Sequence, residues 1–322
     1  MTTMNELLRL FNLSNILSNN KYGRYFEDMD LPYDKTLIFT TDCILNLISE
    51  KHAEYRIEKS ETNNIEGIVI FRKSAWDTEH FEKKTAFLDY ILVNQKNHSK
   101  KVEITKSLIA SFLIWCNQEK IEFVVAKIPS LDLISINELL HNGFDFIESW
   151  IFNKIDLRKY KINNNNLLTL RPAKESDLDY MLEYSKDAFN THRFHADYHI
   201  PYAKAEGLYE KWIKNSFNDS KQNILVYDHE DIPSAFMTYY ILDLSTYYKL
   251  KFAMWKMAVI NSSLRGQGIG MSFFNSLFDY HKKEGLDIVD SGLSLRNIVS
   301  LNTHIKVNFK VISTLVTLHL WI

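Results

Sequence analysis

Cysteine is scarce in this sequence of 322 residues: only Cys43 and Cys116 occur, each inside an apolar stretch. Two isolated thiols supply neither a disulfide framework nor the paired spacing of a zinc site. The low cysteine content therefore argues against a small disulfide-stapled domain. We expect both thiols to be reduced and buried, as in a cytoplasmic protein.

An excess of positive charge is also missing, since 38 Lys and Arg face 40 Asp and Glu for a net charge of -2. A protein that holds nucleic acid through its surface charge has a basic footprint, and this composition has none. With 46% hydrophobic and 24% charged residues, the chain has the composition of an ordinary globular protein. We predict no nucleic-acid partner.

Long apolar runs are absent as well. The stretch "SLIASFLIW", residues 107–115, is far shorter than the ~20 residues of a membrane span. Residues 1–20 lack the basic start and the continuous apolar core of a signal peptide. We predict no membrane partner.

The length and one polar seam indicate two domains, since domains average roughly 150 residues. Four consecutive asparagines, Asn163–Asn166, cannot bury apolar surface and favour turns, so they indicate a linker. We predict domains at 1–162 and 167–322. Alternating strand and helix patterns on both sides of the seam indicate an α/β or α+β fold.

The second half can be divided into elements by its periodicity. A short strand begins near 168, and two helices with apolar stripes follow. A hairpin is expected over 223–244 and a central strand over 249–260. A helix that ends before Gly285 comes next, and then a helix near 297–307 and a last strand.

An internal repeat is visible without gaps. Residues 135–147 align with residues 300–312 at a constant offset of 165, with four identities in thirteen positions. The helix-then-strand pattern is shared, so we expect a duplicated domain. The first copy has no counterpart of the glycine-rich stretch described next.

The stretch "SLRGQGIGMSFF", residues 263–274, places three glycines before an apolar helix. Met271 stands where a dinucleotide-binding fingerprint needs its third glycine, and Met271-Ser272 does not supply the Lys of a P-loop. A tight turn remains an alternative, although one glycine would usually suffice for it. Amides at a helix start, stripped of Cβ atoms by glycine, bind anions such as pyrophosphate.

The order strand, Arg-x-x-Gly-x-Gly, helix resembles the acetyl-CoA site of the GNAT acyltransferase superfamily, and the likeness covers residues 168–322. It implies a mixed central sheet flanked by helices, with a degenerate N-terminal copy. It also implies acetyl-CoA as co-substrate, without a metal. The implied cofactor-binding residues are Met257, Ala258, Val259, Arg265, Gly266, Gln267, Gly268, Ile269, Gly270 and Asn297.

The stretch "NIVSLNTHIKVNF" resembles a later helix of that superfamily, with two departures. His304 stands in place of a tyrosine that protonates the leaving thiolate, and Asn308 in place of a glycine with positive φ. By this resemblance His304 is the catalytic candidate, either as an imidazolium acid or as a base for the amine. A histidine without a role is the alternative.

Three further stretches are similar to TDP-fucosamine N-acetyltransferase-like proteins: "SAWDTEHFEKKTAFL", "RFHADYHIP" and "LYEKWIKNS". The similarity implies a nucleotide-linked amino-deoxy sugar as acceptor. The implied substrate-binding residues are Arg193, His195, Asp197, Tyr209 and Trp212. Tyr209 and Trp212 also lie on an apolar helix stripe, which is typical of core residues. His195 and His199 suggest a metal site, but Pro201 favours a loop there.

We therefore expect an N-acetyltransferase that moves acetyl from acetyl-CoA to an amino sugar. Two alternatives stay open: acylation of a peptide, protein or other small amine, and a non-catalytic acyl-CoA-binding module. The sequence leaves open whether the protein forms a homodimer.

Overall fold

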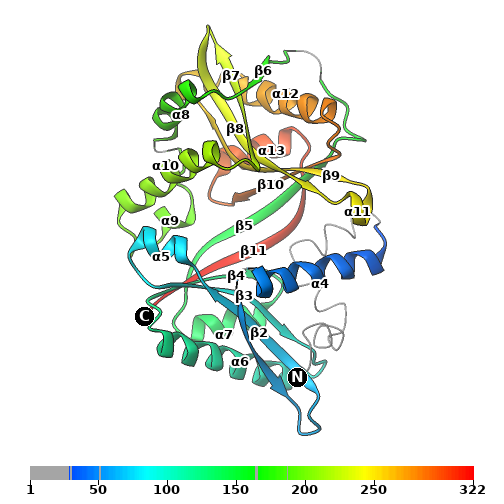
Figure 1. Ribbon diagram of the computed structural model, residues 1–322, viewed down its shortest axis with the longest axis vertical. Helices are drawn as coiled ribbons and strands as arrows, with labels where there is room; N and C mark the ends of the chain where they lie inside the picture. Colours follow the sequence, from blue (N-terminus) through cyan, green and yellow to red (C-terminus); the bar gives the residue numbers. More distant parts are fainter. Residues whose placement is uncertain (1–28, 30, 51, 164–165, 187) are drawn as a thin grey trace. The chain divides into compact units, whose positions relative to one another are not determined.

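The computed structural model describes residues 29, 31–50, 52–163, 166–186 and 188–322 (Figure 1). They form two compact units. The first contains the described residues up to Trp150 together with Ser313–Ile322, and the second is Ile151–Ile312. This division differs from the one predicted from the asparagine run, because the chain enters the second unit inside a strand. The described asparagines of the run, Asn163 and Asn166, lie within the second unit.

The described strands of the first unit follow the order β1-β2-β3-β4-β11, and the first half of β5 is the next neighbour of β11. From β1 to β11, only β3 and β4 pair in parallel; the other neighbours are antiparallel. Its elements are α4 (Tyr33–Glu50), β1 (Glu54–Lys59), β2 (Ile65–Lys73), α5 (Ala75–Phe81), β3 (Thr85–Val93), α6 (His98–Glu119), β4 (Phe123–Pro129), α7 (Leu133–His141), the first half of β5 (Asp145–Asp156) and the end of β11 (Lys310–Trp321).

The second unit has its strands in the order β5-β10-β9-β8-β7-β6, in which β9 and β10 are parallel. Its elements, besides the parts of β5 and β11, are β6 (Leu170–Pro172), η1 (Glu175–Asp177), α8 (Leu178–Ser185), α9 (Arg193–Ala196), α10 (Tyr202–Asn218), β7 (Gln222–His229), β8 (Ile232–Asp243), α11 (Ser245–Tyr248), β9 (Lys251–Ile260), η2 (Ser262–Leu264), α12 (Ile269–Lys283), β10 (Ile288–Ser294) and α13 (Ile298–Lys306).

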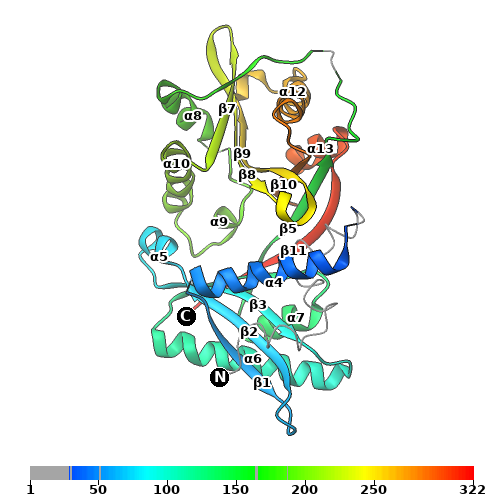
Figure 2. The same cartoon turned by 45° about the vertical axis from the view of Figure 1, so that its right-hand side comes forward.

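Helices cover both faces of each sheet, because the central strands are apolar on both sides. In β2, Ile68 and Ile70 pack in the cluster beneath α4, whereas Val69 and Phe71 pack in the cluster beneath α6. This is the period-2 alternation of a strand buried on two faces. In the second unit α8 and α10 lie on one face of the sheet, and α12 and α13 on the other (Figures 1 and 2).

Cys116 is fully buried in α6, and burial raises the pKa of its thiol to about 12. Cys43 is also a free thiol but is only half-buried, so the burial prediction is correct for Cys116 alone. No helix in the described part of the chain is long and apolar enough to cross a membrane.

The predicted repeat extends over three consecutive elements. β4, α7 and β5 begin and end 165 residues before β10, α13 and β11. The helix ends correspond as well. The side chains of Asp132 and Asn297 cap the two helices, accepting hydrogen bonds from the amides of Ser135 and Ser300.

The turn after each repeated helix also corresponds. Gly143 has φ +86° and Asn308, at the matching position, has φ +64°. Asparagine tolerates this left-handed conformation better than most residues, which confirms the predicted turn. The structure thus confirms a duplicated mixed α/β fold with a central sheet flanked by helices.

Candidate functional site

The parallel strands β9 and β10 separate halfway along their length. They pair over four residues only, from Phe252 with Ile288 to Trp255 with Ser291. Beyond this last pair β9 continues to Ile260 and β10 to Ser294. The opening between the two strand ends, called the wedge below, leaves main-chain groups without a ladder partner from the opposite strand.

A β-bulge at Lys256 marks the start of the wedge. Thr238 pairs with Met257 and Tyr239 with Trp255, so Lys256 is skipped. The amide of Met257 donates to Thr238 Oγ1 at 3.1 Å, and the amide of Asn261 donates to the Ser234 carbonyl at 2.8 Å. Both amides are therefore directed toward β8.

Successive amides of a strand point to opposite sides. The amide of Val259 is therefore directed toward β8, like those of Met257 and Asn261, while the amide of Ala258 is directed toward the wedge. Ala258 is exposed, whereas Met257 and Val259 are buried. Of the three strand residues predicted to line the donor site, only Ala258 has its amide directed toward the wedge.

Two of the three glycines in the loop are needed for its backbone. Gly266 and Gly268 have φ +79° and +82°, and a Cβ built on either meets nothing within 4 Å. Gly270 belongs to α12, where a Cβ would make an ordinary 3.6 Å contact with Ile260 Cδ1. The loop is thus open at Gly266 and Gly268, where a ligand could approach the main chain.

Five successive amides, those of Gly266–Gly270, lie in the turn before α12 and in its first residues, and they donate no hydrogen bond of ordinary distance and angle to another described residue. The first helical donors, Met271 and Ser272, use the carbonyl of Gly268. Gly268 is the N-cap of α12 and provides no side-chain cap. Free amides at the positive end of a helix form an anion site.

Two side chains flank these amides, and they differ in availability. Arg265 is exposed, and no ion pair ties it to another described residue. Gln267 is also exposed, but its Nε2 donates to the Ser263 carbonyl at 3.0 Å and fixes the loop. Arg265 is therefore available to pair with an anion at the start of α12. Ile269, another predicted cofactor-binding residue, is the first residue of that helix.

His304 is buried, and both of its ring nitrogens have partners. Nδ1 lies 2.8 Å from the Ser300 carbonyl and Nε2 lies 2.9 Å from Ser291 Oγ. Burial lowers the pKa of His304 to about 4, against the upward effect of the Ser300 hydrogen bond. The imidazolium acid, one of the two catalytic roles predicted for His304, is therefore a minor species at neutral pH.

Asn297 has a local task at the start of α13. Its Oδ1 accepts the amide of Ser300 at 3.0 Å as the helix N-cap. Asn297 is predicted to bind the cofactor, and with Oδ1 used as the cap its side-chain NH₂ group is the part that could donate to a ligand.

The predicted substrate residues gather at α9 and α10. His195 Nε2 lies 2.7 Å from Glu206 Oε1, and the His195 side chain is 4% exposed. The guanidinium of Arg193 lies over the Phe194 ring at 4.3 Å. Asp197 is buried and its carboxylate accepts the amide of His199.

The aromatic candidates of this group pack in the protein interior. Tyr209 is 2% exposed and stacks on Phe189 at 4.5 Å, and the half-buried Trp212 meets the Tyr209 ring edge-on. The core alternative therefore holds for Tyr209 and in part for Trp212. Among the described residues no group of three or more His, Cys, Asp or Glu is placed to hold a metal ion.

The first unit repeats the wedge but not the anion site. β3 and β4 pair over four residues, up to Leu88 with Ala126, and the register of β2 with β3 shifts between Ile70 and Phe71. The corresponding helix, α6, is capped by Asn97, whose Oδ1 accepts the amide of Lys100 at 3.0 Å. Gln95 Oε1 also accepts the amides of Lys96 and Asn97, whereas no such partner is present for Gln267 and Gly268, the residues at the same two positions of the second unit.

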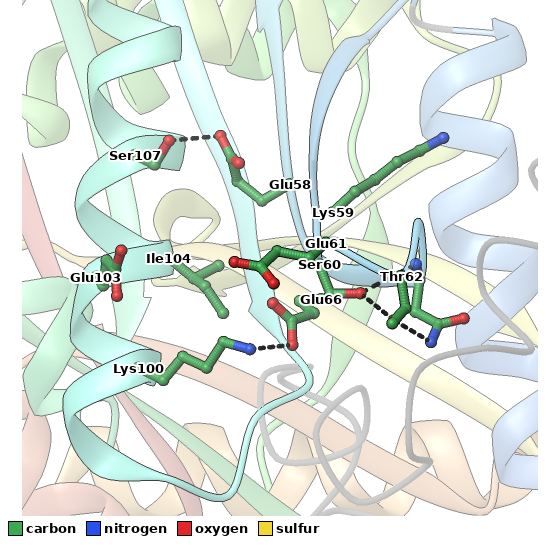
Figure 3. Close-up of a pocket in the computed structure, with 11 residues that line it drawn as sticks. Glu58, Lys59, Ser60, Glu61, Thr62, Glu66, Lys100, Glu103, Ile104 and Ser107 are labelled. Carbon is green, nitrogen blue, oxygen red and sulfur yellow. Dashed lines mark hydrogen bonds and ion pairs between the residues drawn. The ribbon is translucent and has the colours of Figure 1, made fainter.

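A hollow in the first unit lies beside the start of α6 (Figure 3). Carboxylates dominate it: Glu58, Glu61, Glu66 and Glu103 line it, and Lys100 is paired with Glu66 at 2.8 Å. Negative charge at this helix start disfavours a polyphosphate. The hollow is therefore unlike a nucleotide site.

The sequence does not match any known protein-family profile, and no curated protein sequence matches it. Its fold, however, is found among solved structures, and it is the GNAT fold. A GCN5-related N-acetyltransferase from Sphaerobacter thermophilus superimposes with a TM-score of 0.54 at 10% identity, covering 83% of this chain and 80% of the other.

Two further structures resemble the chain over most of its length. A tandem GNAT protein from the clavulanic acid biosynthesis pathway gives a TM-score of 0.52 at 11% identity, covering 84% of this chain and 82% of that one. The glucosamine N-acetyltransferase region of a fungal multi-domain GH3 β-N-acetylglucosaminidase gives 0.57 at 13% identity, covering 95% of this chain and 36% of that one.

Proposed function

We propose that this chain is an N-acyltransferase that takes its acyl group from acetyl-CoA bound by the second unit. The observation that carries the proposal is the row of five free amides, Gly266–Gly270, at the start of α12. Their fit to a pyrophosphate is supported by the open space at Gly266 and Gly268 and by the exposed Arg265.

The wedge supports the second half of the donor site. An extended pantetheine arm carries amide groups that need partners, and the strand ends beyond Trp255 and Ser291 have main-chain groups to offer. In this proposal the Ala258 amide, directed toward the wedge, polarises the thioester carbonyl and stabilises the oxyanion that forms there.

We propose an amino sugar as the acceptor. Two observations support this class: the resemblance of "RFHADYHIP" and "LYEKWIKNS" to enzymes of nucleotide-linked amino sugars, and the glucosamine N-acetyltransferase region among the similar structures. Arg193 and His195 are the side chains of this region that we propose to contact the acceptor. Whether a nucleotide is attached to the sugar is decided by the experiment below.

The experiment is release of free thiol from acetyl-CoA, followed with separate acceptors. We expect thiol release with a TDP-linked 4-amino-4,6-dideoxyhexose or with glucosamine. Faster release with the TDP-linked sugar would show that the nucleotide is recognised, and faster release with glucosamine would show that it is not required. Release only with a peptide amine would contradict the amino-sugar class. Binding of acetyl-CoA without thiol release in the presence of any of the amines would contradict the proposed acyltransferase activity.

The non-catalytic acyl-CoA-binding module stays as a second candidate because of one observation. His304 replaces the tyrosine of the resembled superfamily, and its buried ring is neutral, so its Nε2 carries no proton to give to the thiolate. A mechanism therefore needs another route for the proton.

A further inference from the structure

We propose that Ser291 is a catalytic residue that carries the proton between the acceptor amine and the departing thiolate. In this proposal His304 accepts a proton from Ser291 and later returns it. This inference rests on the proposed acyltransferase function. It assigns a residue that the sequence did not single out.

The hydrogen-bond directions around His304 follow from its partners. The Ser300 carbonyl can only accept, so Nδ1 of His304 carries the ring proton and donates it across 2.8 Å. In the neutral ring Nε2 then holds a lone pair, and the Ser291 hydroxyl donates to it across 2.9 Å. The oxygen of Ser291 keeps its own lone pairs for another donor.

Ser291 stands at the apex of the wedge. It forms the last parallel pair with Trp255, and beyond it the two strands separate. A thioester that reaches the Ala258 amide lies in this opening, so a hydroxyl at the apex lies near the reacting atoms. Ser291 is 6% exposed, so bulk water does not compete strongly for it.

The proposed proton transfers balance. As the C–N bond forms, the amine loses a proton to Ser291 Oγ, and the hydroxyl proton of Ser291 moves to His304 Nε2. As the C–S bond breaks, the imidazolium returns its proton to Ser291 Oγ, and the hydroxyl proton passes to sulfur. The products are an amide and free CoA thiol, and the Ser291–His304 pair is regenerated.

The ease with which His304 loses its proton suits the second step. A buried imidazolium with a pKa near 4 is a much stronger acid than a thiol, whose pKa is roughly 8.5. The ring thus holds the proton briefly and gives it up readily. The Ser300 carbonyl stabilises the charged ring during this interval.

The test is Ser291→Ala, with Ser185→Ala on α8 as the matched control in the same unit. Ser185 is also buried, and its hydroxyl donates to the Met181 carbonyl. We expect Ser291→Ala to lower kcat about 100-fold or more while the KM for acetyl-CoA stays within about twofold. Ser185→Ala should leave both constants near wild type, and Ser291→Thr, which keeps the hydroxyl, should recover part of the loss.

A second measurement protects the test from a folding defect. Ser291→Ala and His304→Gln should each retain acetyl-CoA binding, and the double variant should be no slower than the worse single one, since both residues act in one path. Unchanged kcat in Ser291→Ala, or additive losses in the double variant, would overturn the assignment. Absence of turnover in the wild type would instead overturn the proposed function.

Discussion

Asn97 and Gly268 are the N-cap residues of corresponding helices, yet only Asn97 bonds its side chain to its own helix. Asn97 Oδ1 accepts the Lys100 amide, and Gln95 Oε1 accepts the amides of Lys96 and Asn97. The amides of Gly266–Gly270 have no side-chain partner of this kind among the described residues. Side chains thus close the helix start in one copy of the duplicated fold and not in the other. This difference locates the proposed donor site in the second unit.

Gly268→Ala should weaken acetyl-CoA binding at least about tenfold, since a methyl group enters the space over the free amides. The φ of +82° also disfavours alanine by about 1–2 kcal/mol. Gly285→Ala is the matched control, because Gly285 at the other end of α12 has φ +74° and open space too. Calorimetric titration should show lost affinity in the first variant only. Equal affinities would mean that the loop holds no ligand.

Asn97→Ala should lower the free energy of unfolding by about 0.5–2 kcal/mol through loss of the α6 cap. Acetyl-CoA affinity should not change, because we place the donor in the other unit. Asn97→Gly should lower the free energy of unfolding by only about a few tenths of a kcal/mol, because glycine is itself a tolerated N-cap residue. Comparison of the two variants therefore distinguishes the effect of the cap from a general defect in folding. A large change in acetyl-CoA affinity in either variant would assign the first unit a part in donor binding.

Gly67→Ala should destabilise the first unit by overpacking. The new Cβ would lie 2.6 Å from Ile104 Cγ2 and 2.9 Å from Leu108 Cδ1, where α6 rests on β2. We expect a loss of about 1–3 kcal/mol in urea unfolding. The same substitution in an Ile104→Ala background should cost less, and an undiminished cost there would contradict the close approach.

Acidification should destabilise the protein through His304. Its pKa falls from the ordinary value near 6.5 to about 4 in the folded state, so between these values only the unfolded chain binds the proton. Stability is therefore full above pH 6.5 and is lost as the pH falls toward 4, by about 3 kcal/mol. Urea unfolding should show a flatter pH profile for His304→Gln. Parallel profiles would contradict the burial of a neutral ring.

The glycine loop could be recognised from the sequence because its signal is local. Backbone freedom is coded by glycine itself, and the strand before the loop and the helix after it have clear apolar periods. The repeat could also be recognised, since the turn residues Gly143 and Asn308 stand at matching positions. The loop and the repeat therefore predict the elements of the second unit from β9 to α13.

The pairing of Ser291 with His304 could not be predicted. The two residues stand 13 positions apart on a strand and the following helix, and nothing in a single serine marks it as a partner. The membership of β11 was equally hidden. Its apolar alternation predicts a strand, but not that Ser313–Ile322 would join the sheet of the first unit. Both depend on contacts between distant segments.

The amides of Met257, Ala258 and Val259 point in different directions. The bulge at Lys256 determines which of them is directed toward the wedge. A bulge leaves little trace in an apolar strand sequence. The resemblance pointed to this stretch of strand, and the register of β8 with β9 was needed to propose Ala258 within it.

The most direct measurement of the central claim is a calorimetric titration of the whole chain with acetyl-CoA, read for the number of sites. The account predicts one site per chain, because the second unit has the open helix start and the first has capped its own. Two sites per chain would contradict the assigned loss of the anion site in the first unit. No binding at all would contradict the identification of Gly266–Gly270 as a donor site.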